Sequence, residues 1–126
     1  MRNAGFTLVE LMIAVAILAI VAAVALPLYN QYSQRTFRAE AQADLMTCAQ
    51  GLERFGAQNF TYDGAVLGNV CDPRSEDQGR YTFGLVTAGD QFVITATPIG
   101  VMAGDGDLTL NSAGDRTWDG NPGWEE

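Results

Sequence analysis

A single acidic side chain, Glu10, stands at the head of a long apolar run and is the first residue whose placement suggests chemistry. The run continues without a polar residue from Leu11 to Leu26. A carboxylate at the edge of such a segment is costly to place in a membrane, so an acid found there marks a functional position by default. Glu10 is therefore our first candidate functional residue.

The join between Gly5 and Phe6 lies just before this acid. An ordinary secretory signal carries its apolar stretch ahead of a small-residue cleavage site. Here the small residue, Gly5, comes before the apolar stretch, so a cut after Gly5 would leave that stretch on the mature protein. Residues 1–5 are accordingly predicted to be a short charged leader.

Two cysteines, Cys48 and Cys71, form the second constellation. They lack the CxxC spacing of zinc and redox sites, and the chain contains no histidine that could complete a zinc site. If the domain is exported, a disulfide is the natural interpretation, and two free buried thiols are the alternative. Closing a loop of this size would stabilise the fold by about 3 kcal/mol.

The charge balance excludes several classes of function. Fifteen acidic residues face seven basic ones, giving a formal net charge of −8, and this acidity disfavours binding to a phosphate backbone. Because histidine is absent, Ser33, Ser75 and Ser112 have no imidazole to activate them. We therefore expect no enzyme, no catalytic residue, no cofactor and no nucleic-acid partner.

Four aspartates in glycine-rich sequence are the remaining candidate site. Oxygen-rich turns of this kind can hold Ca²⁺, although the spacing departs from the EF-hand pattern. We favour solvated turn carboxylates and keep calcium as the alternative. The four residues are Asp105, Asp107, Asp115 and Asp119.

The element that carries Glu10 is predicted to be a membrane-spanning helix. Residues 6–28 include about 20 apolar residues, the length that a bilayer core requires. Pro27 lies near the outer end, where it would kink the helix or loosen a turn. Tyr29 and Tyr32 follow, and tyrosines suit a membrane interface.

The helix is predicted to continue beyond the span to Phe55, with Gly56 as its stop. Six apolar residues recur at spacings of three and four, which indicates one buried face, and the charged residues, Arg38 among them, are placed largely off it. The apolar stripe consists of Phe37, Ala41, Leu45, Cys48, Leu52 and Phe55. Cys48 then points into the core, where Cys71 could reach it.

Strands follow a predicted loop that extends over residues 59–80. Residues 81–86 and 91–98 alternate around a turn at 88–90 and read as an antiparallel hairpin. Residues 108–110 and 116–118 are short further strands, and the tail after Asp119 is expected to be irregular. The predicted fold class is α+β, with a long helix packed on a small antiparallel sheet of about four strands.

Gly5-Phe-Thr-Leu-Val-Glu-Leu-Met12 resembles the N-terminus of type IV prepilins, a family that includes the pseudopilins of type II secretion and the competence pilins. The later segments are most similar to PilE-type minor pilins. They are Thr61-Tyr62, Tyr81-Thr-Phe83, Ala96-Thr-Pro98 and Leu108-Thr-Leu-Asn-Ser-Ala-Gly114. The resemblance covers essentially the whole chain and implies the pilin fold.

That resemblance implies a role for each residue at the N-terminus. A prepilin peptidase would cut between Gly5 and Phe6 and methylate the amine of Phe6. Glu10 would neutralise the N-terminal amine of a neighbouring subunit, since opposite charges in low dielectric offset each other's desolvation. Pro27 matches the family's helix-breaking proline, whereas the glycine that many pilins carry within the apolar run is missing.

The resemblance also implies a location and partners. The subunit would be single-pass in the inner membrane before assembly and would then join a pilus on the cell surface. Residues 29–126 would form the periplasmic or extracellular globular domain. Its partners would be other pilins, the peptidase and the inner-membrane assembly machinery, and its roles would be pilus biogenesis, adhesion or twitching motility.

Three alternatives remain open from the sequence. A type II secretion pseudopilin would use the same polymer physics, and calcium-dependent stability would favour it. A DNA-uptake competence pilin would need a basic patch, for which Arg74 and Arg80 are too few. A singly anchored periplasmic enzyme would need a catalytic cluster.

Many PilE-like pilins also close their C-terminal region with a disulfide, which this chain must replace by strand pairing and by Trp118 and Trp124.

Overall fold

The computed structural model describes residues 5–124, so most of the predicted leader, residues 1–5, lies outside the described residues. The chain begins with one long helix, α1 (Leu8–Asn59). The whole chain divides into two compact units, one ending at Arg35 and the other beginning at Thr36. Each unit is described by itself below.

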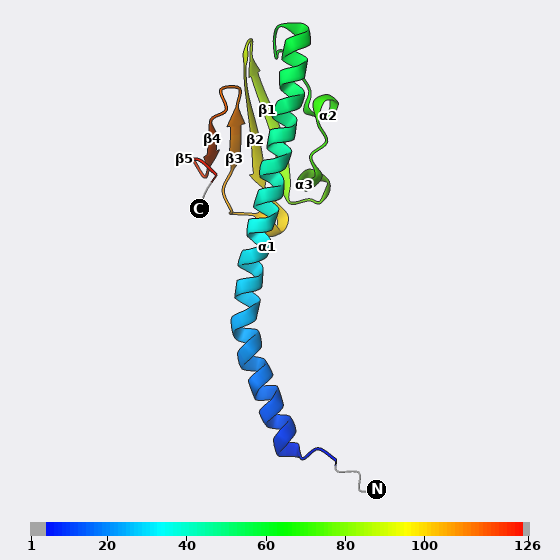
Figure 1. The fold of residues 1–126 in the computed structure, drawn as a ribbon, viewed down its shortest axis with the longest axis vertical. Coiled ribbons are helices and arrows are strands. Elements are labelled where there is room, and N and C mark those ends of the chain that lie inside the picture. Colours follow the sequence, from blue (N-terminus) through cyan, green and yellow to red (C-terminus); the bar gives the residue numbers. More distant parts are fainter. Residues whose placement is uncertain (1–4, 125–126) are drawn as a thin grey trace. The chain divides into compact units, whose positions relative to one another are not determined.

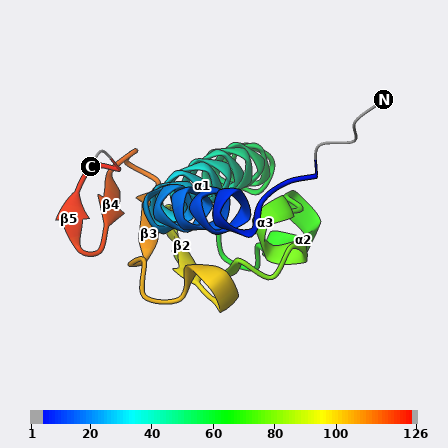
Figure 2. The same ribbon diagram turned by 90° about the horizontal axis from the view of Figure 1, so that it is seen from below.

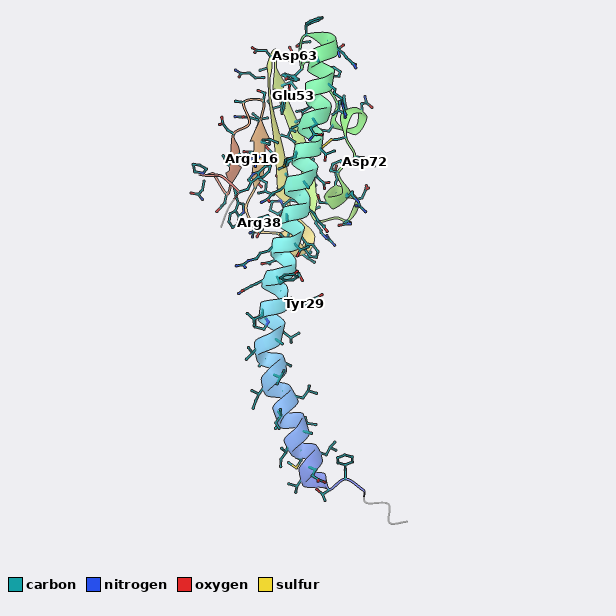
Figure 3. The ribbon with its side chains drawn as sticks, in the orientation of Figure 1. Tyr29, Arg38, Glu53, Asp63, Asp72 and Arg116 are labelled. Carbon is teal, nitrogen blue, oxygen red and sulfur yellow. A yellow bond between two sulfur atoms is a disulfide. The ribbon has the colours of Figure 1, made fainter. Side chains whose placement is uncertain are left out.

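The first unit is the N-terminal part of α1, and it contains the apolar run. The α-helix continues through Pro27, the proline that was expected to disturb it. Large apolar side chains from Leu8 to Leu28 are each more than half exposed, and Figure 3 shows them projecting from all sides of the helix. Among the described residues, α1 is the one helix long and apolar enough to cross a membrane.

The second unit opens with the remainder of α1, which buries one face. The buried residues of the helix are Arg38, Ala41, Leu45, Cys48, Gly51 and Leu52. The helix ends at Asn59 and not at Gly56, because Gly56 serves another purpose. A Cβ at this position would lie 2.6 Å from the ring of Tyr62, so glycine here permits close packing rather than ending the helix. Phe60, in a left-handed conformation with φ of 59°, provides the stop.

The segment predicted to be a loop contains two single-turn helices, α2 (Leu67–Val70) and α3 (Arg74–Asp77). Both contact the first strand of the sheet. In Figures 1 and 2 they lie on one side of the unit, while β4 and β5 lie on the other. The short helices thus lie against β1, the edge strand of the sheet.

The sheet is antiparallel with the strand order β1-β2-β3-β4-β5, which is also the order in the chain (Figure 1). The fifth strand is two residues long and forms in the tail that was expected to be irregular. Its register pairs Thr117 with Pro122 and Trp118 with Asn121. The strands are β1 (Tyr81–Ala88), β2 (Gln91–Pro98), β3 (Leu108–Asn111), β4 (Arg116–Trp118) and β5 (Asn121–Pro122), with a 3₁₀ turn η1 (Gly100–Met102) between β2 and β3.

The core of the second unit lies between the buried face of α1 and the inner face of the sheet. Burial alternates along β2, where Phe92, Ile94 and Ala96 are buried and their neighbours are not. This alternation is what a half-buried strand requires. The buried apolar residues are Ala41, Leu45, Cys48, Leu52, Tyr81, Phe92, Ile94, Ala96, Met102, Leu108 and Leu110.

Candidate functional site

The N-terminus of α1 forms a reciprocal cap between Thr7 and Glu10. The backbone N–H of Thr7 and its hydroxyl both donate to Glu10 Oε2, each at 2.9 Å. In return, the backbone N–H of Glu10 donates to the hydroxyl of Thr7 at 3.2 Å. This arrangement is a capping box, which satisfies N–H groups that a helix end leaves unpaired. The carboxylate predicted to act in assembly therefore also fixes the start of the helix.

Phe6 and Glu10 remain accessible at this end of the chain. Phe6 is 90% exposed and precedes the capped turn, and Glu10 is also exposed. An apolar surface this extensive on residues 6–28 is far larger than soluble monomers present, so it marks a surface meant for lipid or for other apolar helices. The structure does not test cleavage after Gly5, methylation of Phe6 or an assembly role of Glu10 and Pro27, which stay predictions.

Cys48 and Cys71 form a disulfide with a Cα–Cα distance of 4.9 Å. Cys48 is fully buried on α1, and Cys71 directly follows α2. Beside the bond, Gly51 contacts the carbonyl of Val70 at a distance that leaves no space for a Cβ. The disulfide and this close approach together hold the 60–80 segment against the helix.

The least expected feature is a buried arginine on α1. Arg38 is only 7% exposed and donates to both carboxylate oxygens of Asp105, at 2.8 Å from Nε and 2.5 Å from Nη2. Its guanidinium also lies 3.9 Å from the centre of the Trp118 ring, whose Nε1 donates to the Asp105 carbonyl at 2.8 Å. The hydroxyl of Tyr81 is 3.4 Å from the same carboxylate. Figure 3 labels Arg38 within this unit.

The prediction that Arg38 lies off the buried stripe is therefore wrong. The signal was present, because positions 38, 41, 45, 48 and 52 are spaced three, four, three and four apart, as one helix face requires. A stripe defined by apolar residues alone leaves out position 38, because arginine is charged. Its burial is possible because the guanidinium is paired with a carboxylate and stacked on an indole. Burial, with the charge of Asp105 second, raises the pKa of the Tyr81 phenol well above its usual value.

A second arginine, Arg80, packs against Phe37, the helix residue next to Arg38. The guanidinium of Arg80, just before β1, lies 3.5 Å from the centre of the Phe37 ring. It also pairs with Glu40 at 2.5 Å. Phe37 and Arg38 are adjacent in the chain. Phe37 is held by the residue that directly precedes β1, and Arg38 is held by a contact with β4.

The four aspartates proposed as a calcium alternative do not converge. The carboxylate of Asp105 is taken by Arg38, and that of Asp115 accepts a hydrogen bond from Asn111 at 3.0 Å. Asp107 and Asp119 line a shallow hollow with Gly104, Gly106 and Gly120. Within residues 5–124, no group of three or more acidic, cysteine or histidine side chains is placed to hold a metal ion.

The C-terminal tail is held by tryptophan, as the sequence indicates in the absence of a further disulfide. The indole N–H of Trp124 donates to the carbonyls of Thr109 and Thr117, each at 3.2 Å. Gln42 on α1 donates to the carbonyl of Trp124 at 3.3 Å. These contacts connect the end of the chain to two strands and to the helix.

Comparison with known families agrees with this architecture. Residues 27–109 match the family described as "Type IV minor pilin ComP, DNA uptake sequence receptor", and residues 1–26 match the "Prokaryotic N-terminal methylation motif". The chain belongs to the type IV pilins, and its α+β fold of a long apolar helix and an antiparallel sheet is the pilin fold.

Individual relatives support the same assignment. The chain is 45% identical over 82 residues to the type IV major fimbrial protein FimA of Dichelobacter nodosus, covering 61% of this chain and 48% of that protein. It is 34% identical over 103 residues to the major pilin PilA of Myxococcus xanthus, covering 81% and 46% respectively. The chain thus spans about half the length of the curated relatives it matches.

The fold is also similar to that of a solved structure. The non-core minor pilin PilV of Neisseria meningitidis superposes with a TM-score of 0.56 at 21% identity, covering 75% of this chain and 93% of that one. At this identity the likeness concerns the fold alone.

Proposed function

We propose that this type IV pilin is a minor subunit of a type IV pilus, inserted in the inner membrane and then transferred into the fibre through residues 6–28. The observation that carries the proposal is the contrast between that segment and the rest of the chain. Residues 6–28 are apolar and exposed on all sides, whereas residues 36–124 bury their own core. A helix apolar all round needs a lipid or protein environment.

Glu10 is the proposed assembly residue, after cleavage between Gly5 and Phe6. In the isolated chain its carboxylate binds the Thr7 backbone and hydroxyl. It remains exposed, so a carboxylate lone pair is available to an amine from a neighbouring subunit. Pairing would offset the cost of both charges within an apolar fibre core.

The minor role is supported by the match to a family described as a minor pilin, whereas the curated relatives FimA and PilA are named major pilins. The abundance of the subunit in the fibre distinguishes a minor pilin from a major one. We expect quantitative mass spectrometry of sheared pili to find this subunit at a small fraction of the main pilin. A chain that makes up most of the fibre mass would contradict the minor assignment while keeping the pilin one.

The assembly mechanism is tested with matched glutamate substitutions in the full chain. Glu10→Gln is expected to be cleaved and to begin at Phe6 by intact mass, yet to be largely missing from sheared pili. Glu76→Gln, at an exposed position of α3, removes the same charge elsewhere and should enter pili normally. If both variants enter equally, Glu10 is not the assembly residue.

DNA capture is a second candidate, because the matching family is described as a DNA uptake sequence receptor. The charge distribution weighs against it. Arg38 and Arg80 lie over aromatic rings and pair with carboxylates, which leaves their positive charge little access to phosphate. Arg116 lies over the Trp124 ring and is exposed. Fluorescence anisotropy with labelled duplex DNA at low salt tests this. Binding that is abolished in an Arg54→Ala, Arg74→Ala double variant would favour the competence role.

The effect of Ca²⁺ on thermal stability distinguishes a secretion pseudopilin from a pilus subunit. We expect Ca²⁺ to leave the thermal unfolding of the globular unit unchanged, because Asp105 and Asp115 are engaged with Arg38 and Asn111. A rise in the unfolding temperature that is abolished in Asp107→Asn would favour the pseudopilin.

A further inference from the structure

The strand residues on the outer face of the sheet, turned away from the core, are all uncharged. The register of the five strands places twelve residues on this face, and we call them the neutral face. They are Thr82, Gly84, Val86, Ala88, Gln91, Val93, Thr95, Thr97, Thr109, Asn111, Thr117 and Pro122. In a chain with a net charge of −8, a face of this size without an acid is a distinct feature.

The centre of the neutral face is flat and needs little solvation. Thr95, Thr109 and Thr117 lie side by side on β2, β3 and β4, and Gly84 extends the row on β1 without a side chain. The hydroxyls of Thr109 and Thr117 bond to each other at 2.6 Å. Because these groups already have partners, covering them would cost less than covering free hydroxyls.

One end of the face is apolar and uncovered. Val86 and Val93 lie directly opposite each other on β1 and β2, and they are 70% and 40% exposed. Beyond them the charge returns, with Asp90 in the turn that follows β1. The carboxylate of Asp115 also lies at this end, because it accepts a hydrogen bond from Asn111, the residue opposite Val93. At the other end of the sheet, Asp107 and Asp119 form an acidic border.

We propose that the neutral face is a contact surface for a second copy of this chain, with the two sheets stacked face to face. Two copies carry the same negative charge, so surfaces that bear carboxylates repel each other. The neutral face is where they can meet with few ionised groups nearby, because the Asp115 carboxylate, bonded to Asn111, lies only at its margin. A two-fold axis near Val86 and Val93 would place the valines of one copy on those of the other, the self-complementary arrangement of symmetric dimers.

The size of the face predicts a weak contact. Strand spacing and rise give an area of about 400–500 Å² per copy, against about 800 Å² per partner in a stable interface. A single pair would therefore dissociate readily, but many copies held in one membrane or one fibre would reinforce one another. The contact adds a lateral association to the proposed assembly through residues 6–28 and does not depend on it.

Thiol crosslinking of the full chain in its own membrane tests the contact. Stacked sheets lie about 10 Å apart, beyond the Cα–Cα reach of a disulfide, so a short bismaleimide is used. Thr95→Cys, at the centre of the face, is expected to give crosslinked dimers with this reagent. Thr47→Cys, exposed on α1, serves as the control and should give few. Equal crosslinking of the two variants would overturn the proposal, because it would report random collision.

Two valines with matched exposure make the test specific. In the Thr95→Cys background, Val86→Glu should lower the dimer yield about fivefold or more, since a carboxylate would be buried without a partner. Val101→Glu should leave it unchanged, because Val101 is 71% exposed but lies on η1. Unchanged crosslinking in Val86→Glu would assign the dimer to the apolar helix and overturn the proposal. Tryptophan fluorescence checks that both variants fold.

Salt gives an independent readout. In washed membranes, raising the ionic strength should increase the dimer yield, because it screens the repulsion between the acidic borders of two copies. A contact based on ion pairs would weaken instead, and that result would contradict a neutral interface.

Discussion

The two halves of α1 have the same backbone and opposite surroundings. Residues 8–35 expose apolar side chains on every face, whereas residues 36–59 bury a single face under a sheet. The first half needs a partner outside the unit to cover its surface, and the second half finds its partner within the same fold. A continuous helix therefore does not imply a continuous function, because the surface that each half presents decides what it can do.

Both tryptophans, Trp118 and Trp124, lie in the second unit. In the full chain in detergent micelles, their fluorescence therefore reports on unfolding of that unit alone. This property allows each half of the helix to be altered and compared in the same measurement.

The largest effect is expected at Arg38. Arg38→Ala leaves the carboxylate of Asp105 without its partner, so we expect the free energy of unfolding to fall by about 3–5 kcal/mol. Denaturant unfolding followed by tryptophan fluorescence measures the loss. Arg54→Ala, at an exposed position of the same helix, is the control and should change it little. A loss below about 1 kcal/mol would mean that the pair contributes no more than a surface salt bridge.

A matched pair of leucines tests the division of the helix directly. Leu45→Ala removes a fully buried side chain and should cost about 3 kcal/mol through lost burial and the remaining cavity. Leu18→Ala removes the same atoms from an exposed position in the first half and should leave the unfolding midpoint unchanged. An equal loss in both variants would show that the two halves unfold as one cooperative unit.

Alkaline pH should destabilise the second unit through Tyr81. The folded state raises the pKa of this phenol above that of the unfolded chain, near 10, so its contribution is complete below about pH 10 and is lost as the pH rises. By pH 11 the loss should be about 1 kcal/mol, because one proton contributes at most about 1.4 kcal/mol per pH unit. Tyr81→Phe should remove this part of the pH dependence. An identical alkaline slope in wild type and variant would contradict the assignment to Tyr81.

The smallest effect is expected at the helix start. Thr7→Ala removes the hydroxyl of the capping box and should weaken the first turn by about 1 kcal/mol. Amide hydrogen exchange in micelles should become about fivefold faster for Glu10 and Leu11, whose N–H groups bond to Thr7, while Thr7→Ser should restore it. Faster exchange in the second unit would contradict a local effect.

The sequence predicts elements well where one physical rule acts alone. Uniform apolarity identifies a membrane-length helix, which begins at Leu8 and not at the predicted Phe6. Alternation locates β1 and β2, and the stripe places Cys48 where Cys71 can reach it. Each of these patterns is local, so neighbours in the chain carry the whole signal.

The sequence fails where a residue depends on a distant contact. Arg38 looked solvent-exposed because Asp105, 67 residues away, supplies the charge that permits burial. From the local sequence, Gly56 indicates a helix stop. Its role is to make room for the ring of Tyr62, which belongs to the following loop and lies outside the local pattern. The strand at Asn121–Pro122 depends on pairing with β4. None of these partners is visible in the local pattern.

The disulfide also sets how far the chain could lengthen under load. If the second unit were pulled open from its ends, the bond between Cys48 and Cys71 would keep the residues between them, a separation of 23, from bearing tension. At about 3.3–3.6 Å per extended residue, roughly 75 Å of contour length stays closed. A single-molecule pulling trace should lengthen by about that amount when the bond is reduced. Oxidation thus makes the subunit a shorter and less extensible tether.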